Sequence, residues 1–175
     1  LPMSHGSWVP HVRSKAHLEV GDTTSRSLVV FPRVGDEIVI PQDGEVIFRG
    51  TFDWYWGEGL LLKHSPNIYS VITGGGIDTF LASKVVVGQR LSRGSVIGRI
   101  ERESDQVEWT LVGYDTRSMR GEADAANGGQ VLAGIPSEIS SSDFEVNPGM
   151  TMRWLTRGEL LDVTALVGMG RLDIV

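Results

Sequence analysis

Few side chains in this sequence are of the types that bind metals or transfer protons. The chain has four histidines and no cysteine. His5, His11 and His17 lie in a polar N-terminal stretch without the spacing of a shared metal site, so they predict no metal centre. His64 precedes Ser-Pro-Asn, a turn sequence, and is interpreted as a hairpin residue. The lack of cysteine excludes disulfides, thiolate metal sites and cysteine nucleophiles.

Carboxylates and glycines offer two other kinds of chemistry. Asp105 and Glu108 are spaced as an acid–base pair could be, but no histidine or arginine cluster accompanies them to tune their pKa values. Solvated charges at a strand edge are therefore the favoured interpretation. The run Gly74-Gly75-Gly76 resembles a phosphate-binding loop in composition only. No helix is predicted after it, so a flexible turn is favoured.

A dense aromatic cluster follows Phe52. The segment reads Phe-Asp-Trp-Tyr-Trp and stands beside a predicted turn at Gly57. Trp54, Tyr55 and Trp56 have two equally favoured interpretations: rings packed alternately into the core, or exposed rings that bind a sugar or a partner protein. These three residues and Trp154 are our candidate interaction residues.

Short β-strands separated by glycine-rich turns must position these side chains. Glycine accounts for 22 of the 175 residues, close to twice its usual share of about 7%. Short apolar runs recur roughly every ten residues without a clear amphipathic helix, which predicts an all-β sandwich or barrel. The residues between 64 and 67 predict a hairpin turn. The predicted strands of the main body are 28–31, 37–40, 45–48, 60–63, 69–72, 80–81, 85–87, 95–100 and 107–112.

The stretch from Val85 to Gly98 carries the clearest motif. It reads Val-Val-Val-Gly-Gln-Arg-Leu-Ser-Arg-Gly-Ser-Val-Ile-Gly. This resembles the Val-Gly-Gln-x-Val-x-x-Gly-x-x-Ile-Gly segment of the lysostaphin-like (LytM-type) zinc endopeptidase domain. Weaker counterparts of the family pattern are Ile40–Gly44 and His64–Ser70. The resemblance covers about residues 28–112 and implies a barrel-sandwich hybrid, a LytM-like β-sandwich.

The resemblance also implies a zinc site whose ligands this chain lacks. The family uses His, Asp and His ligands, and its His-x-His pair falls here on Gln106 and Glu108. Its His-x-x-x-Asp should fall within 25–31, which contains neither residue. One carboxylate without an imidazole binds zinc poorly. We therefore predict a degenerate domain with no metal ligands, no catalytic residues and no cofactor.

The segments that flank this core divide the chain. Residues 1–27 are interpreted as an extended leader, 28–117 as the degenerate LytM-like domain, and 118–149 as a linker or surface excursion. Residues 150–175 are predicted to form a C-terminal arm, a β-meander with strands at 150–154, 161–166 and 171–175. Such an arm has too few strands to cover its own apolar face, so it should pack on the main body or on a partner.

Charge and hydropathy narrow the range of partners. The net charge of −6 and the scattered basic residues argue against nucleic acid. No segment reaches the roughly 18 apolar residues needed to span a membrane, and the N-terminus lacks the features of a signal peptide. We expect a non-enzymatic protein that binds other protein subunits, with peptidoglycan as an alternative ligand and no membrane insertion.

Among such roles we favour a structural subunit of a phage tail tip or baseplate, located in the virion. The basis is that such assemblies reuse lysostaphin-like modules, which is an argument by family analogy. The second hypothesis is a catalytically dead LytM-type regulator of cell-wall amidases in the periplasm or cell envelope. The third is an active zinc peptidoglycan endopeptidase.

Overall fold

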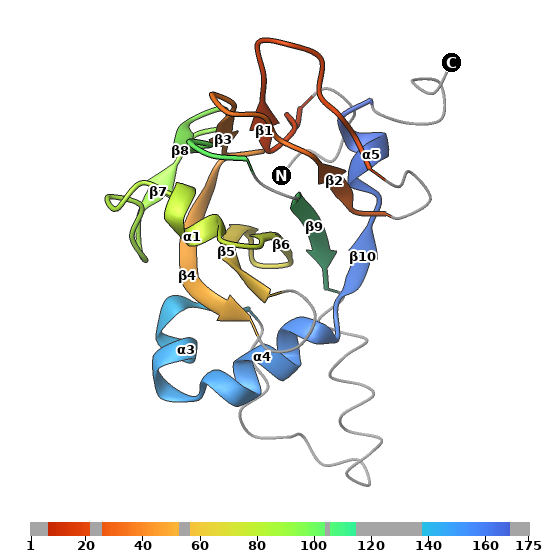
Figure 1. The fold of residues 1–175 in the computed structure, drawn as a ribbon. Coiled ribbons are helices and arrows are strands. Elements are labelled where there is room, and N and C mark those ends of the chain that lie inside the picture. Colours follow the sequence, from red (N-terminus) through yellow and green to blue (C-terminus); the bar gives the residue numbers. More distant parts are fainter. Residues whose placement is uncertain (1–6, 22–25, 53–56, 104–105, 115–137, 169–175) are drawn as a thin grey trace, which may run out of the picture.

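The computed structural model describes residues 7–21, 26–52, 57–103, 106–114 and 138–168, which form two antiparallel sheets and a few short helices (Figure 1). The larger sheet has the order β10-β9-β6-β5-β4-β7, with β2 also paired to β9, and the smaller sheet has the order β1-β3-β8. The all-β prediction is confirmed. The strands are β1 Val12–Arg13, β2 Leu28–Val30, β3 Glu37–Val39, β4 Gly44–Phe52, β5 Gly57–Ser65, β6 Ile68–Gly74, β7 Arg90–Leu91, β8 Val96–Arg99, β9 Val107–Gly113 and β10 Glu159–Leu161, and the helices are α1 Ile77–Phe80, α3 Ser141–Val146, α4 Pro148–Thr156 and α5 Val163–Leu166.

The centre of the larger sheet is a β5–β6 hairpin, and β6 pairs with β9 on its other side. Leu62 pairs with Ser70, and Ser65 pairs with Ile68. The predicted hairpin around residues 64–67 is therefore confirmed. Strands β6 and β9 are buried at five of seven positions each, and β5 at four consecutive positions, instead of alternating between buried and exposed. This pattern indicates that both faces of the larger sheet are covered.

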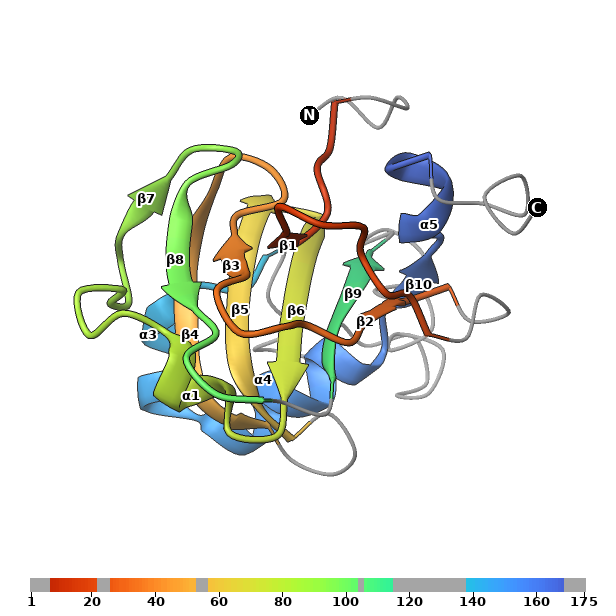
Figure 2. The same cartoon turned by 45° about the horizontal axis from the view of Figure 1, so that its top comes forward.

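The smaller sheet covers one face of the larger sheet, as Figure 2 shows. Ile38 and Ile97 of the smaller sheet pack there with side chains of the larger one, among them Leu60 and Trp109. We call this cluster the inner core. Its members are Trp8, Val12, Leu28, Val30, Ile38, Ile40, Val46, Leu60, Leu62, Ile72, Ile77, Phe80, Leu81, Val85, Ile97, Ile100, Val107, Trp109, Leu111 and Val163.

Helices α3 and α4 cover the opposite face of the larger sheet (Figure 1). Phe144 of α3 stacks on Phe48 with ring centroids 4.7 Å apart, and the Tyr114 hydroxyl donates to Leu155 O at 2.5 Å. We call this second cluster the outer core. Its members are Ile47, Phe52, Leu61, Tyr69, Val71, Val112, Tyr114, Ile139, Phe144, Met152, Trp154 and Leu155, with Phe48 packed against them.

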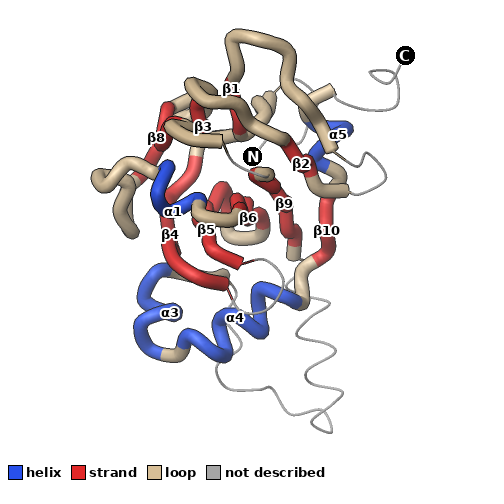
Figure 3. The backbone as a smooth tube through the Cα atoms, viewed as in Figure 1, coloured by secondary structure: helices blue, strands red, loops and turns tan. Residues whose placement is uncertain are grey.

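The predicted C-terminal β-meander is wrong where the structure describes it. Residues Met150–Trp154, predicted as a strand, lie within helix α4. The Asn147 side chain accepts a hydrogen bond from the Met150 amide, and Pro148 occupies the first turn, two features typical of a helix start. Residues 161–166, also predicted as a strand, divide between the end of β10 and helix α5, drawn in Figure 3 as a strand followed by a helix. The last predicted strand, 171–175, lies outside the described residues.

The flanking segments pack more closely on the domain than expected. In the predicted leader, Trp8 and Val12 belong to the inner core, and β1 pairs with β3. In the predicted linker, Ile139 and Phe144 belong to the outer core, while residues 115–137 lie outside the described residues. These apolar side chains are too widely spaced in the sequence to produce a strand or helix pattern, which is why they escaped prediction.

Residues 80–81 and 85–87 were also predicted as short strands, but the structure does not form strands there. Phe80 ends the one-turn helix α1, which follows the glycine run, and Leu81 forms an isolated bridge with Gly98. A β-carbon at Gly98 would lie 2.3 Å from Phe80 O. A glycine at this position is therefore what allows the α1 segment to lie directly against β8.

Candidate functional site

The positions that match the family's His-x-His pair lie at the start of β9. Gln106 is exposed and precedes the strand, and Glu108 is half-buried between Thr73 of β6 and Val29 of β2. Side chains alternate along a strand. Since Val107 contributes to the inner core, Glu108 points to the opposite face of the sheet.

His11 is buried on the inner-core side of the same strand. Its Nε2 lies 2.9 Å from Val107 O, and because a carbonyl oxygen only accepts, Nε2 carries the proton. Its ring also lies 6.0 Å from that of Trp109, and its Nδ1 is buried without a hydrogen-bond partner. Desolvation lowers the pKa of His11 from 6.5 to about 4. His11 is therefore a neutral core residue.

His64 takes part in a hydrogen-bond chain that resembles a nucleophile–base pair. Its Nε2 lies 2.6 Å from Ser70 Oγ, and its Nδ1 lies 2.9 Å from Asp43 O. Trp109 Nε1 donates to Ser70 Oγ at 2.9 Å. Since Asp43 O only accepts, His64 donates through Nδ1, and Nε2 then accepts from the Ser70 hydroxyl. Trp8 contacts the rings of both His64 and Trp109.

Burial argues against hydrolytic chemistry at this pair. Ser70 is completely buried in the sheet, so a substrate has no access to its hydroxyl. Burial also lowers the pKa of His64 to about 4, which makes it a weak general base at neutral pH. These hydrogen bonds satisfy the buried polar groups of Trp109, Ser70 and His64, so the role of the His64–Ser70 pair is structural.

The described residues do not fit a catalytic zinc site. No group of three or more His, Cys, Asp or Glu side chains lies close enough together within the described ranges to hold a metal ion. His11 and His64 contact the inner-core residue Trp109 directly or through Ser70, whereas Glu108 points to the other face. The larger sheet thus separates the imidazoles from the one carboxylate at a family ligand position. Catalytic zinc sites need three protein ligands on one ion.

The candidate interaction residues have different outcomes. Trp54, Tyr55 and Trp56 lie outside the described residues, as does Asp105. Trp154 is buried in the outer core, with its ring centroid 3.8 Å from that of Tyr114. This burial argues against the prediction of Trp154 as an interaction residue.

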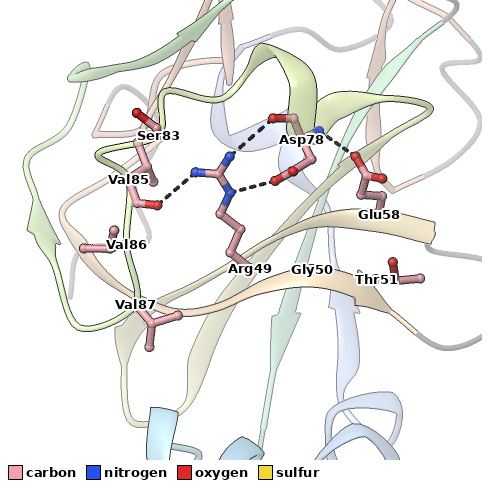
Figure 4. A pocket seen from close by; sticks show the side chains of 9 residues that line it. All are labelled: Arg49, Gly50, Thr51, Glu58, Asp78, Ser83, Val85, Val86 and Val87. Carbon is pink, nitrogen blue, oxygen red and sulfur yellow. Dashed lines mark hydrogen bonds and ion pairs between the residues drawn. The ribbon is translucent and has the colours of Figure 1, made fainter.

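A surface hollow at the edge of the larger sheet was missed by sequence reasoning. It has a volume of about 570 Å³ and lies where β4, β5 and helix α1 approach the loop 83–87 (Figure 4). We call it the edge pocket. It is lined by Arg49, Gly50, Thr51, Glu58, Asp78, Ser83, Val85, Val86 and Val87. These residues come from four separate segments, of which only 85–87 lies in the family-like motif, so only the fold reveals the pocket.

Arg49 organises the edge pocket through internal contacts (Figure 4). Its Nε donates to Asp78 Oδ1 at 2.7 Å, and its Nη1 donates to Ala82 O and Val85 O at 2.8 and 2.9 Å. Glu58 Oε1 accepts from the Asp78 amide at 2.6 Å. The guanidinium thus fixes α1 and the following loop onto β4. Its charge is used inside the protein.

A comparison with models of known protein families and with curated protein sequences finds no match. Solved structures that resemble the chain include a putative M23 peptidase from Pseudomonas aeruginosa, with 20% identity, a TM-score of 0.45, and coverage of 62% of this chain and 48% of that one. Lysostaphin from Staphylococcus simulans has 13% identity and a TM-score of 0.44, with 67% and 55% covered.

A third similar structure is the catalytic domain of the prophage-encoded M23 protein EnpA from Enterococcus faecalis. It has 13% identity and a TM-score of 0.41, with 63% of this chain and 87% of that one covered. The match spans about half the length of the Pseudomonas and lysostaphin chains.

None of the described helices is long and apolar enough to cross a membrane. The longest of them, α4, has nine residues, whereas a membrane-spanning helix needs about 20.

Proposed function

We propose that this chain is a non-enzymatic binding protein, a degenerate LytM-like domain that acts through its surface. The observation that supports this most directly is the distribution of possible metal ligands. Glu108 and Gln106 occupy the family's ligand positions, and His11 and His64 are held on the opposite side of β9 by hydrogen bonds to Val107 O and Ser70 Oγ. Within the described ranges, these side chains do not lie close enough together to bind one ion.

We further propose that the binding partners are protein subunits of a larger assembly, with a phage tail tip or baseplate as the specific candidate. The leader and the C-terminal segment pack on their own domain through Trp8, Val12 and Leu155, so they are not the support for this proposal. The support is the analogy with other assemblies of lysostaphin-like modules and the accessible edge of the larger sheet at β4. Peptidoglycan is the alternative ligand.

Metal analysis and a hydrolysis assay test the absence of enzymatic activity. We expect the purified chain to contain far less than one zinc per molecule after incubation with zinc and desalting, and to leave peptidoglycan uncleaved. The double variant Gln106→His/Glu108→His should also leave peptidoglycan uncleaved, because the remaining ligands would still be missing. Stoichiometric zinc together with cleavage by the unmodified chain would refute the proposal.

Localisation tests the proposed assembly. We expect mass spectrometry to detect the chain in purified virions, at a copy number that is a multiple of the symmetry of the tail tip. Recovery of the chain only from the cell-envelope fraction would contradict a virion subunit. If the purified chain then also increased the rate of peptidoglycan cleavage by a cell-wall amidase, the regulator hypothesis would replace it.

A further inference from the structure

We propose that the open edge of β4, beside the edge pocket, binds an extended lysine- or arginine-bearing segment of another protein, which adds to the larger sheet as a new strand. This inference rests on the proposed binding function and names the surface that carries it. The chemistry is main-chain hydrogen bonding along β4, combined with side-chain contacts in the pocket.

The first observation is that β4 loses its outer neighbour halfway along its length. The pairing with β7 covers only Gly44 and Glu45. Val46 then exchanges hydrogen bonds with the loop at Gln89 and Gly88, at 2.9 and 2.7 Å. From residue 48 to residue 51, β4 pairs with β5 on its inner side, and no described strand pairs with its outer side. Such an edge offers unpaired N–H and C=O groups to an incoming strand.

The second observation is an apolar surface next to this edge. Val86 and Val87 line the pocket with 53% and 47% of their surfaces exposed. They lie across the pocket from Gly50 and Thr51 of β4 (Figure 4). A strand laid along β4 would direct alternate side chains towards these valines. Short aliphatic side chains of the partner would lose contact with water there.

The third observation is the charge of the pocket. Arg49 contributes one positive charge and is bonded to Asp78 and to two backbone carbonyls. Asp78 and Glu58 contribute two negative charges, and the Asp78 carboxylate is more than half exposed. The lining is therefore left with one excess negative charge, which favours a cationic side chain on the partner.

The same charge argues against a second copy of this chain as the partner. Antiparallel pairing of two β4 edges about a twofold axis would bring the two pockets, each with its excess negative charge, to one interface. Like charges placed together disfavour an interface. A basic segment from a different protein avoids this repulsion.

Binding of a designed peptide to the full chain tests the proposal. The probe is a seven-residue peptide of alternating valine and threonine with lysine at its centre, capped at both ends. We expect it to shift the backbone amide NMR signals of residues 49–52 and 85–87 in a saturable way. A matched peptide with glutamate in place of lysine should bind at least about tenfold more weakly because of repulsion by the pocket.

Two variants and one modified peptide locate the contact. Val87→Lys should weaken binding of the lysine peptide at least about tenfold, because it removes apolar contact and repels the ligand's cation. Val146→Lys on α3 should bind as the unmodified chain does, since Val146 is 84% exposed and is not among the residues that line the pocket. N-methylation of alternate peptide amides should abolish binding, because it removes the donors that pair with a strand edge.

Each contrary result would overturn the inference. Unchanged signals for residues 49–52 at millimolar peptide would exclude the β4 edge as the site. Equal binding of the glutamate and lysine peptides would refute the charge argument, and binding that survives N-methylation would refute strand addition. A dimer detected by sedimentation and lost in Val87→Lys would show that a second copy is the occupant. None of these results depends on zinc content or hydrolysis, so failure here is distinct from failure of the proposed function.

Discussion

Protonation of His11 should destabilise the fold as the pH falls from neutrality. His11 is fully buried, with Nε2–H bonded to Val107 O and Nδ1 without a partner. Desolvation lowers its pKa to about 4 in the folded chain, against 6.5 for an exposed histidine. Between these two pKa values the unfolded chain binds a proton that the folded chain does not. The free energy of unfolding therefore decreases as the pH is lowered from about 6.5 towards 4.

The size of the effect follows from the separation of the two pKa values. Each pKa unit corresponds to about 1.4 kcal/mol. Lowering the pH from about 7.5 to about 5 should therefore reduce the free energy of unfolding by about 2 kcal/mol through His11 alone. His64, whose pKa is lowered by burial as well, adds a contribution of the same sign.

Urea unfolding at the two pH values measures this contribution. The variant His11→Gln removes the titrating group, so its free energy of unfolding should fall by about 2 kcal/mol less between the two pH values than that of the unmodified chain. His17→Gln is the matched control, because His17 is exposed, and it should change the pH dependence little. The comparison uses only the difference between pH values, so a general loss of stability in His11→Gln does not affect it.

The burial argument would be refuted if His11→Gln had the same pH dependence as the unmodified chain. It would also be refuted by an NMR titration in which the ring of His11 gains a proton near pH 6.5. Either result would mean that the imidazole is solvated, and that His11 could leave Val107 O to bind a metal or a ligand.

Three further predictions concern packing. Trp154→Ala should lower the free energy of unfolding by about 3–5 kcal/mol through loss of a large buried side chain, whereas exposed Met150→Ala should change it by less than about 0.5 kcal/mol; equal urea midpoints would show that Trp154 is not core. Gly59→Ala should lower the free energy of unfolding by about 3 kcal/mol or more, since a β-carbon there would lie 2.1 Å from Ile72 O. An unchanged melting temperature would contradict this close approach of the two strands. Ser70→Ala should lower the free energy of unfolding by about 1–3 kcal/mol because it leaves buried polar groups unpaired. An unchanged melting temperature would show that these hydrogen bonds do not stabilise the fold.

The sequence predicted the centre of the fold better than its periphery. The β5–β6 hairpin was predictable because a turn sequence, Ser65-Pro66-Asn67, separates two apolar runs, and such signals are local. Helix α4 was missed because Met150–Trp154 contains alternating apolar residues that also suit a strand. Its helical signal lies in Asn147 and Pro148, which were interpreted as part of the linker or surface excursion.

The site shows the same division between local and long-range information. Gln106 and Glu108 were located by a motif in adjacent sequence, and their place at the start of β9 follows from it. The burial of His11 beside β9 depends on β1 crossing to β3, a contact between segments far apart in the chain. The edge pocket likewise needs Arg49 to reach the loop after α1. No periodicity or spacing in the sequence encodes such contacts.

Because both faces of the larger sheet are covered, a shorter fragment of this chain should fold only if it keeps the segments that cover them. A fragment cut at 28–117, the limits suggested by the motif, would lose Trp8 and Val12 from one face and the whole α3–α4 hairpin from the other. The remaining strands would expose hydrophobic side chains to solvent on both faces of the sheet, and such exposed apolar surface promotes aggregation. Expression of this module for binding work should therefore keep at least residues 7–168 in one piece.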